Sequence, residues 1–234
     1  MTVWGNRCCD KVFDIDGKLC EVFDLKHLVI IGVGGFAREC YWHAQGSIGY
    51  GEEWDIKGFL DGDVKLATEE YEKLEKPVLG NVASYDIQSD DVFICAIADC
   101  DVRKRLTDTV LERRGTFINL IHKTAIIQGN VKMGNGVIVG PFSHVNDHAE
   151  IGDFVILSTA GIGHDGKVGS YSSFLGNTSL CGFAVAGEFT YWATNAVALP
   201  HSRVEEHVYV GVNSVVFRHI KAGQRVFGNP AMPI

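Results

Sequence analysis

Residues 133–157 read M-G-N-G-V-I-V-G-P-F-S-H-V-N-D-H-A-E-I-G-D-F-V-I-L. An apolar residue returns at every sixth position of this stretch: Met133, Val139, Val145, Ile151 and Leu157. Neither a helix, with 3.6 residues per turn, nor a half-buried strand, with a period of two, produces that step. A six-residue period is typical of a parallel β-helix, whose short strands bury their inward side chains only when coils stack on one another.

The same step covers most of the second half of the chain. It begins at Ile127, runs to Leu157, and restarts at Val168. From there the apolar positions are Val168, Phe174, Leu180, Ala186, Trp192, Ala198, Val204, Val210 and Val216. We therefore predict a β-helix domain over residues 122–226, followed by a C-terminal tail at 227–234.

Trp192 gives this register a sharp test. Residues eighteen apart lie above one another in a three-sided coil of hexads, so Trp192 shares an interior column with Phe174 and Val210. Its neighbours on the other two sides of its coil are Ala186 and Ala198. One large and two small side chains keep the coil volume near that of three aliphatic residues, as a close-packed interior requires. We predict that the indole points inward.

Residues 27–121 follow a different pattern, in which apolar strand-like runs alternate with helical stretches. The predicted strands are 27–31, 56–60, 91–97 and 117–121, and the predicted helices are 38–44 and 102–114. This order indicates a small parallel sheet covered on both faces, an α/β Rossmann-like domain. Residues 1–26 form an N-terminal extension in which 12–17 and 19–23 could pair as a hairpin packed on that domain.

The composition narrows the possible partners and the compartment. The net charge of −8 argues against nucleic acid, because a phosphate backbone requires a basic face. We expect no membrane span and no secretory signal, since the longest apolar run is short and rich in glycine. The seven cysteines are scattered without a C-x-x-C pair, which indicates free thiols and a cytoplasmic location.

Five motifs in this order and spacing resemble a known family. They are I-I-G-V-G-G-F-A-R-E at 30–39, G-F-L-D-G-D at 58–63, F-I-N-L-I-H-K-T-A at 117–125, I-G-H-D-G-K-V-G at 162–169 and G-N-P-A at 228–231. The family comprises bacterial sugar acyltransferases with a Rossmann-like N-terminal domain and a left-handed β-helix of hexapeptide repeats. It includes acetyl-CoA-dependent N-acetyltransferases of 4-amino-sugar nucleotides and sialic acid O-acetyltransferases. The resemblance implies acetyl-CoA as co-substrate, a nucleotide-sugar substrate and a homotrimer with active sites between neighbouring β-helices.

The first glycine cluster, Gly32-x-Gly34-x-x-Ala37, matches the dinucleotide fingerprint between a strand and a helix. Such glycines let backbone N–H groups approach a phosphate at a helix N-terminus. However, Asp61 follows Gly32 by 29 residues, where an NAD site places its acidic residue about 20 residues on. The resemblance implies a nucleotide sugar instead, bound by Gly34, Gly35, Phe36, Asp61, Gly62 and Ala98. Family members often have histidine where this chain has Phe36, and a glycine turn needed only for packing is the alternative interpretation.

His164 and Asp165 stand where the six-residue step is shortened, between Gly163 and Val168. The resemblance implies that His164 is the general base and that Asp165 orients its imidazole. An imidazole suits this task because it accepts a proton at neutral pH and releases it afterwards. The alternative is a polar turn residue whose hydrogen bonds are satisfied by the backbone.

The cofactor site is implied by the resemblance at three positions. Gly182 corresponds to a glycine whose backbone N–H holds the thioester oxygen, and Thr194 to a further cofactor-lining residue. Ser173 stands where better-known members have a histidine that contacts acetyl-CoA. No metal is expected: His201 and His219, eighteen residues apart, could stack on adjacent coils but have no evident third ligand. The last coils carry four basic residues that could bind CoA phosphates or serve only as solvent-exposed charges: Arg203, Arg218, Lys221 and Arg225.

These inferences favour acetyl-CoA-dependent N-acetylation of a nucleotide-linked amino sugar of the 4-amino-4,6-dideoxyhexose type. O-acetylation of a sialic acid or another sugar hydroxyl is the alternative within enzymes, because the same base serves both nucleophiles. A non-catalytic nucleotide-binding scaffold is the alternative of another class. An NAD oxidoreductase would require a nicotinamide site that the sequence does not show.

Overall fold

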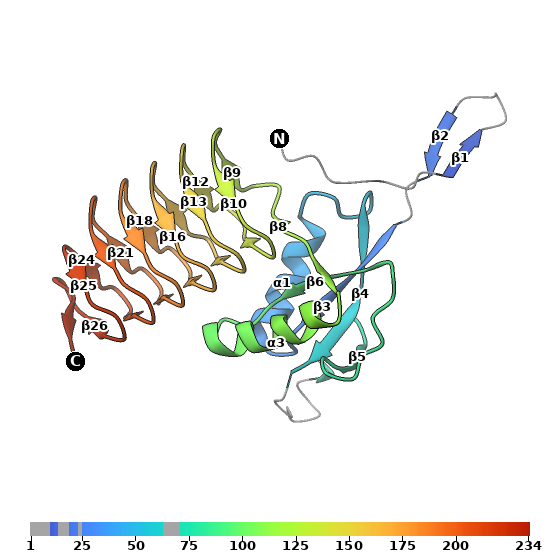
Figure 1. Ribbon diagram of the computed structural model, residues 1–234, viewed down its shortest axis with the longest axis horizontal. Coiled ribbons are helices and arrows are strands. Elements are labelled where there is room, and N and C mark those ends of the chain that lie inside the picture. Colours follow the sequence, from blue (N-terminus) through green and yellow to red (C-terminus); the bar gives the residue numbers. More distant parts are fainter. Residues whose placement is uncertain (1–9, 14–18, 23–24, 63–70) are drawn as a thin grey trace.

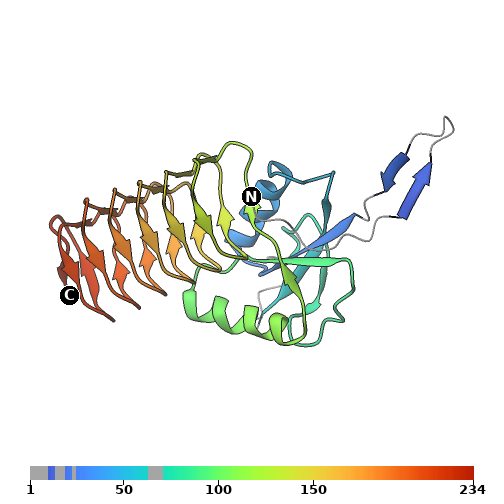
Figure 2. The same cartoon turned by 45° about the horizontal axis from the view of Figure 1, so that its top comes forward.

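The computed structural model describes residues 10–13, 19–22, 25–62 and 71–234, and shows an α/β domain beside a β-solenoid (Figures 1 and 2). The first domain holds a five-stranded parallel sheet in the order β5-β4-β3-β6-β7. Its strands are β3 (Lys26–Ile31), β4 (Trp54–Asp61), β5 (Val78–Asn81), β6 (Asp91–Cys95) and β7 (Thr116–Phe117), and its helices are α1 (Gly35–Gln45) and α3 (Cys100–Glu112). None of the helices in these described ranges is long and apolar enough to cross a membrane.

Helices α1 and α3 cover opposite faces of the sheet. Alternate residues of β3 point to different hydrophobic clusters: Leu28 and Ile30 pack with α1, and Val29 and Ile31 pack with α3. This alternation is the period of two expected of a strand with both faces buried. The predicted Rossmann-like arrangement is confirmed, although β5 was missed. Its sequence, V-L-G-N, carries too little apolar pattern to indicate a strand.

The strand predicted at 117–121 is two strands that belong to different domains. β7 pairs with β6 in the first domain, whereas β8 (Leu120–Ile121) pairs with β11 in the solenoid. The chain passes from the first domain to the solenoid at Asn119. Its side-chain oxygen accepts from the Val137 N–H at 2.9 Å, and its side-chain nitrogen donates to the carbonyl of Gly134 at 2.9 Å. The side chain therefore substitutes for backbone hydrogen bonds where the chain changes sheets.

At the N-terminus, β1 (Asp10–Phe13) and β2 (Leu19–Val22) pair antiparallel, as the predicted hairpin requires. The hairpin forms its own two-stranded sheet and lies away from the first domain in both views (Figures 1 and 2), so the predicted packing against that domain is not seen.

The second domain is a left-handed parallel β-helix with three sheets. Sheet I contains β9 (Ile126–Ile127), β12 (His144–Val145), β15 (Gly161–Ile162), β18 (Ser179–Leu180), β21 (Val197–Ala198) and β24 (Val215–Val216). Sheet II contains β10 (Lys132–Met133), β13 (Glu150–Ile151), β16 (Lys167–Val168), β19 (Val185–Ala186), β22 (Arg203–Val204) and β25 (His219–Ile220). Sheet III contains β8, β11 (Ile138–Val139), β14 (Ile156–Leu157), β17 (Ser173–Phe174), β20 (Tyr191–Trp192), β23 (Tyr209–Val210), β26 (Arg225–Phe227) and β27 (Met232–Pro233), the last of which pairs antiparallel with β26.

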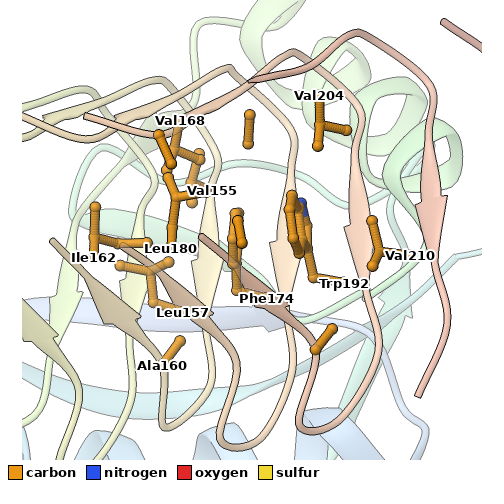
Figure 3. Packing of buried hydrophobic residues seen from close by; sticks show 14 of the residues in the cluster. Val155, Leu157, Ala160, Ile162, Val168, Phe174, Leu180, Trp192, Val204 and Val210 are labelled. Carbon is orange, nitrogen blue, oxygen red and sulfur yellow. The ribbon is translucent and has the colours of Figure 1, made fainter. Parts of the chain in front are cut away.

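The interior of the solenoid confirms the predicted position of Trp192 (Figure 3). Its side chain is fully buried and stacks on Phe174, with ring centroids 5.2 Å apart and planes 11° apart. Ala186 and Ala198 are buried beside it in the same cluster. The indole N–H donates to the Thr190 hydroxyl at 3.0 Å, which satisfies the polar end of a buried tryptophan.

The shortened step lies one turn earlier than predicted. Three residues, 158–160, connect β14 to β15, whereas four connect β15 to β16. Thr159 takes the positive φ, 54°, that closes the shorter turn. Ile162 is therefore an interior residue with no exposed surface, a position that the sequence register omitted. His164 stands in a full-length turn, so the predicted link between this histidine and an irregular coil is wrong.

A second short connection separates β24 from β25 and breaks the predicted stack of His201 and His219. His219 lies on β25, opposite Arg203 of β22, and its Nε2 is 2.7 Å from a Glu205 carboxylate oxygen. His201 lies in a turn and stacks on Phe183 instead. Within the described ranges, no group of three or more His, Cys, Asp or Glu side chains is arranged to hold a metal ion.

Lys57 supports a buried carboxylate at the start of β6. Asp91 has no exposed side-chain surface and accepts from Lys57 Nζ at 2.6 Å, Tyr85 Oη at 2.9 Å and the Gln88 N–H at 2.8 Å. Burial alone would lower the pKa of Lys57, but the hydrogen bonds with Asp91 and Tyr85 and the attraction of the carboxylate outweigh it. The pKa of Lys57 is raised to about 12.

We expect Lys57→Met to lower the free energy of unfolding by about 2 kcal/mol at pH 7, because it leaves the Asp91 carboxylate buried without its cation. A raised lysine pKa stabilises the fold fully below the ordinary value of about 10.5 and loses that stabilisation as the pH rises through about 12. Urea denaturation at several pH values measures this. The control is Lys132→Met, because Lys132 is 80% exposed and makes only a 3.4 Å surface pair with Glu150. Equal effects of the two substitutions at pH 7 would contradict the account.

Candidate active site

His164 and Asp165 form a hydrogen-bonded pair at the corner between sheets I and II. The His164 Nδ1 is 2.9 Å from an Asp165 carboxylate oxygen, and the two side chains are 58% and 43% exposed. Asp165 has a φ of 57°, and its N–H donates to the Asp147 carbonyl one coil away at 3.0 Å. In the tautomer whose Nδ1–H donates to the carboxylate, Nε2 carries the lone pair that a base needs. This is the arrangement of an oriented general base.

Gly182 lies beside this imidazole, on the next coil. A Cβ atom at position 182 would stand 2.6 Å from His164 Nε2, so only glycine leaves room for the ring. The Gly182 N–H has no acceptor among the hydrogen bonds of the described residues and remains free to donate to a ligand. The predicted pair of base and thioester-oxygen donor is therefore brought together at one corner.

Phe183 completes the corner and was not predicted from the sequence. Its ring meets the His164 imidazole edge-on, with centroids 5.0 Å apart and planes at 88°, and stacks on His201 at 4.9 Å. Position 183 is eighteen residues after Asp165, so the repeat itself could have placed it here. The aromatic ring packs against the imidazole from the next coil.

A second imidazole–carboxylate pair lies one coil away at the same corner. His148 Nδ1 is 2.8 Å from an Asp147 carboxylate oxygen, and both side chains are largely exposed. Hydrogen bonds from Asn130 and then His148 lower the pKa of Asp147. The side chains are exposed to solvent.

The glycine cluster after β3 separates into one structural glycine and two accessible ones. Gly32 has a φ of 119°, and a Cβ there would meet the Ala96 carbonyl at 3.0 Å. A Cβ atom added at Gly34 would have no other atom within 4 Å. A Cβ atom added at Gly35 would have only the Arg38 guanidinium nearby. Helix α1 begins at Gly35 without a side-chain cap. Packing thus explains Gly32 but not Gly34 or Gly35, whose open backbone is suited to an anion at a helix N-terminus.

Two further loops follow β4 and β6, the strands on either side of β3, at the same edge of the sheet. At the end of β4, one Asp61 oxygen accepts from Tyr71 Oη at 2.6 Å, while the other is buried without a hydrogen-bond partner among the described residues. Gly62 is buried, and its carbonyl accepts from Asn81. Ala98 follows β6, the strand next to β3. Carboxyl ends of parallel strands bind ligands where the strand order reverses, and here that point is between β3 and β6.

The remaining predicted cofactor residues are not near His164 in this chain. Ser173 is fully buried under the first domain; its hydroxyl donates to the Ala98 carbonyl at 2.7 Å and accepts from Arg103 Nη1 at 2.9 Å. The contact of Ser173 with cofactor stays a prediction, and in this chain the α/β domain covers sheet III at this coil. Thr194 is exposed, but it lies at the corner between sheets III and I.

The two candidate half-sites lie on different sides of the β-helix. The first domain covers sheet III, since Ile138 and Ile156 join its core and Ser173 bonds to Ala98. The corner that carries His164 is between the other two sheets, across the coil from sheet III. In one chain, the candidate base His164 and the candidate nucleotide loops therefore do not face each other.

Comparisons with known proteins confirm the resemblance drawn from the motifs. Residues 27–110 match the family model described as the PglD N-terminal domain. A GDP-perosamine N-acetyltransferase of Escherichia coli O157:H7 is 26% identical over 146 residues, which is 59% of this chain and 66% of that protein, just under two thirds of its length.

Two solved structures share the fold over nearly the whole chain. The acetyltransferase domain of PglB from Neisseria gonorrhoeae FA1090, in complex with acetyl coenzyme A, has a TM-score of 0.80 and 23% identity over 90% of this chain and 100% of that one. PerB from Caulobacter crescentus, in complex with CoA and GDP-perosamine, has a TM-score of 0.78 and 23% identity over 91% of this chain and 99% of that one. At these identities the likeness establishes the two-domain fold.

Proposed function

We propose that the protein transfers an acetyl group from acetyl-CoA to the amino group of a nucleotide-linked amino sugar. The observation that carries the proposal is the His164–Asp165 pair set against the glycine backbone at position 182. The bound CoA and GDP-perosamine of PerB, and the name of the E. coli relative, support the substrate class. The accessible Gly34–Gly35 backbone supplies a site for the diphosphate.

The reaction assigns one task to each part of the corner. The amino nitrogen of the sugar attacks the thioester carbonyl carbon while His164 Nε2 takes a proton from that nitrogen. The carbonyl oxygen gains negative charge, which the Gly182 N–H stabilises by a hydrogen bond. The C–S bond then breaks, the electron pair leaves on sulfur, and the proton passes from His164 to the thiolate. Asp165 keeps the imidazole oriented and stabilises its transient positive charge.

The separation of the two half-sites supports assembly of the active site from more than one chain. We propose a homotrimer in which His164 of one subunit faces the nucleotide loops of another. Sedimentation of the purified protein measures the subunit number. Coexpression of a His164→Ala chain with a Gly35→Glu chain tests the sharing of sites, because mixed trimers contain some sites with both halves intact. Recovered activity supports the shared site, and activity no greater than that of either variant alone opposes it.

The function is tested by release of the CoA thiol in the presence of acetyl-CoA. The panel contains UDP- and GDP-linked 4-amino sugars, the same nucleotides carrying a hydroxyl in place of the amine, and free sialic acid. We expect release only with an amino-sugar nucleotide. Release with hydroxyl sugars alone would identify an O-acetyltransferase. Failure to bind acetyl-CoA in calorimetry would indicate a non-catalytic scaffold.

Gly182→Ala is expected to lower kcat at least tenfold without unfolding the protein. The added Cβ would meet His164 Nε2 at 2.6 Å and displace the imidazole from the attacking nitrogen. The matched control is Gly176→Ala, because nothing lies within 4 Å of a Cβ at that turn glycine. Thiol-release kinetics and the thermal midpoints of both variants measure the effect. Equal kcat values for the two variants would show that the backbone at 182 does not adjoin the reacting atoms.

A further inference from the structure

Arg103 of α3 is a charged side chain buried where the two domains meet. Only 1% of its surface is exposed, and no carboxylate forms an ion pair with it among the described residues. Its guanidinium donates instead to neutral oxygens. Nη1 reaches the Ile97 carbonyl at 2.6 Å, the Ala98 carbonyl at 3.2 Å and Ser173 Oγ at 2.9 Å, Nε reaches the Phe154 carbonyl at 2.9 Å, and Nη2 donates to the Tyr171 carbonyl.

These acceptors belong to two groups that Arg103 joins. Ile97 and Ala98 form the loop after β6, whereas Phe154, Tyr171 and Ser173 belong to the β-helix. Ser173 adds a direct bond, since its hydroxyl also donates to the Ala98 carbonyl. Burying a guanidinium is costly, and apolar side chains would close such a junction at least as well. Its planar fork, however, fixes several carbonyls in one geometry.

The fixed carbonyls determine where the loop's N–H groups point. In a planar trans peptide the N–H points opposite to the preceding carbonyl. Because the Ile97 and Ala98 carbonyls face Arg103, the N–H groups of Ala98 and Asp99 face away from it. Neither N–H has an acceptor among the hydrogen bonds of the described residues. They lie in the loop after β6, and the carbonyl of Ala96, the first residue of this loop, lies close to Gly32 in the turn after β3.

We propose that Arg103, together with Ser173, is a positioning residue that holds the Ala98 and Asp99 N–H groups toward the phosphates of the bound nucleotide sugar. The inference rests on the proposed function, because it assigns a nucleoside diphosphate to this edge of the sheet. It also gives the buried hydroxyl of Ser173 a role on the nucleotide side of the reaction. Arg103 acts through the loop and does not itself contact substrate.

The test compares Ser173→Ala and Arg103→Lys with Ser172→Ala by calorimetry, using UDP, GDP and CoA as probes. Ser172 is the matched control: it is equally buried, and its hydroxyl donates to the Gly187 carbonyl at 2.9 Å, within the β-helix alone. For the diphosphate that the wild type binds, we expect Kd to rise about fivefold in Ser173→Ala and about tenfold or more in Arg103→Lys, as loss of one or more hydrogen bonds predicts. CoA affinity should stay within about twofold of the wild-type value in all three variants, because the Ala98 and Asp99 N–H groups are assigned to the phosphates of the nucleotide sugar and not to CoA.

Each outcome separates the positioning role from the proposed function. Wild-type diphosphate affinity in both Ser173→Ala and Arg103→Lys would overturn the positioning role and leave the proposed function standing. Equal weakening of diphosphate and CoA binding, or weakening in Ser172→Ala as well, would show a general structural effect and overturn it too. A wild-type protein that binds CoA but neither diphosphate would contradict the nucleotide half of the proposed function and this inference with it. If Arg103→Lys does not fold, the Ser173→Ala comparison decides.

Discussion

His164→Ala is expected to lower kcat by a factor of about one hundred or more, because general-base catalysis by a positioned imidazole contributes on the order of 10²–10⁴ to the rate. The substitution removes Nε2, which lies beside the Gly182 backbone, and leaves the surrounding coil hydrogen bonds in place. We expect the KM for acetyl-CoA to change little, since the imidazole acts mainly in the transition state. Thiol-release kinetics with the accepted amino-sugar nucleotide measure both constants.

His148→Ala is the control for this experiment. His148 is also an exposed imidazole hydrogen-bonded to a neighbouring carboxylate at the same corner, but it lies one coil from His164 and two coils from Gly182. We expect its kcat to stay within about twofold of the wild-type value, as for a surface side chain away from the reacting atoms. The subunit number of His164→Ala should equal that of the wild type. Wild-type turnover in an intact His164→Ala assembly would refute the mechanism.

Trp192→Ala is expected to lower the free energy of unfolding by about 3–5 kcal/mol, the usual cost of truncating a large buried aromatic residue. The indole fills its coil between Ala186 and Ala198, whose side chains are too small to occupy the space it leaves. The substitution also removes the stack on Phe174 and the hydrogen bond to Thr190. Chemical denaturation followed by far-ultraviolet circular dichroism measures the loss.

Trp42→Ala controls for the loss of a tryptophan as such. Trp42 is 58% exposed on α1, and its removal should change the unfolding free energy by about 0.5 kcal/mol or less. If the denaturation midpoint of Trp192→Ala shifts from the wild-type value no further than that of Trp42→Ala, the indole does not stabilise the coil.

The hexad period predicted the β-helix because a solenoid buries one apolar side chain at every step. That logic placed Phe174, Trp192 and Val210 in a single column without reference to the structure. It failed at Ile162, because a three-residue turn shifts the register and a glycine-rich sequence does not show which turn has lost a residue. The same limit misplaced His219, which follows another short connection.

The candidate site was predictable to the extent that it is local. His164 and Asp165 are adjacent in the sequence, and Gly182 and Phe183 follow them by one coil of eighteen residues. The position of Ser173 depends on which sheet of the β-helix the first domain covers, which no repeat pattern specifies. In the sequence, Arg103 cannot be told from an exposed residue of a polar helix. Only the packing of the two domains shows that it is buried.

The most direct test of the account is the identity of the product formed from acetyl-CoA and an amino-sugar nucleotide. The account predicts a nucleotide sugar that gains one acetyl group by mass spectrometry and keeps it after hydroxylamine treatment, because an amide resists this reagent and an ester does not. A product that loses its acetyl group to hydroxylamine, or no acetylated nucleotide sugar from a protein that binds both substrates, would contradict it.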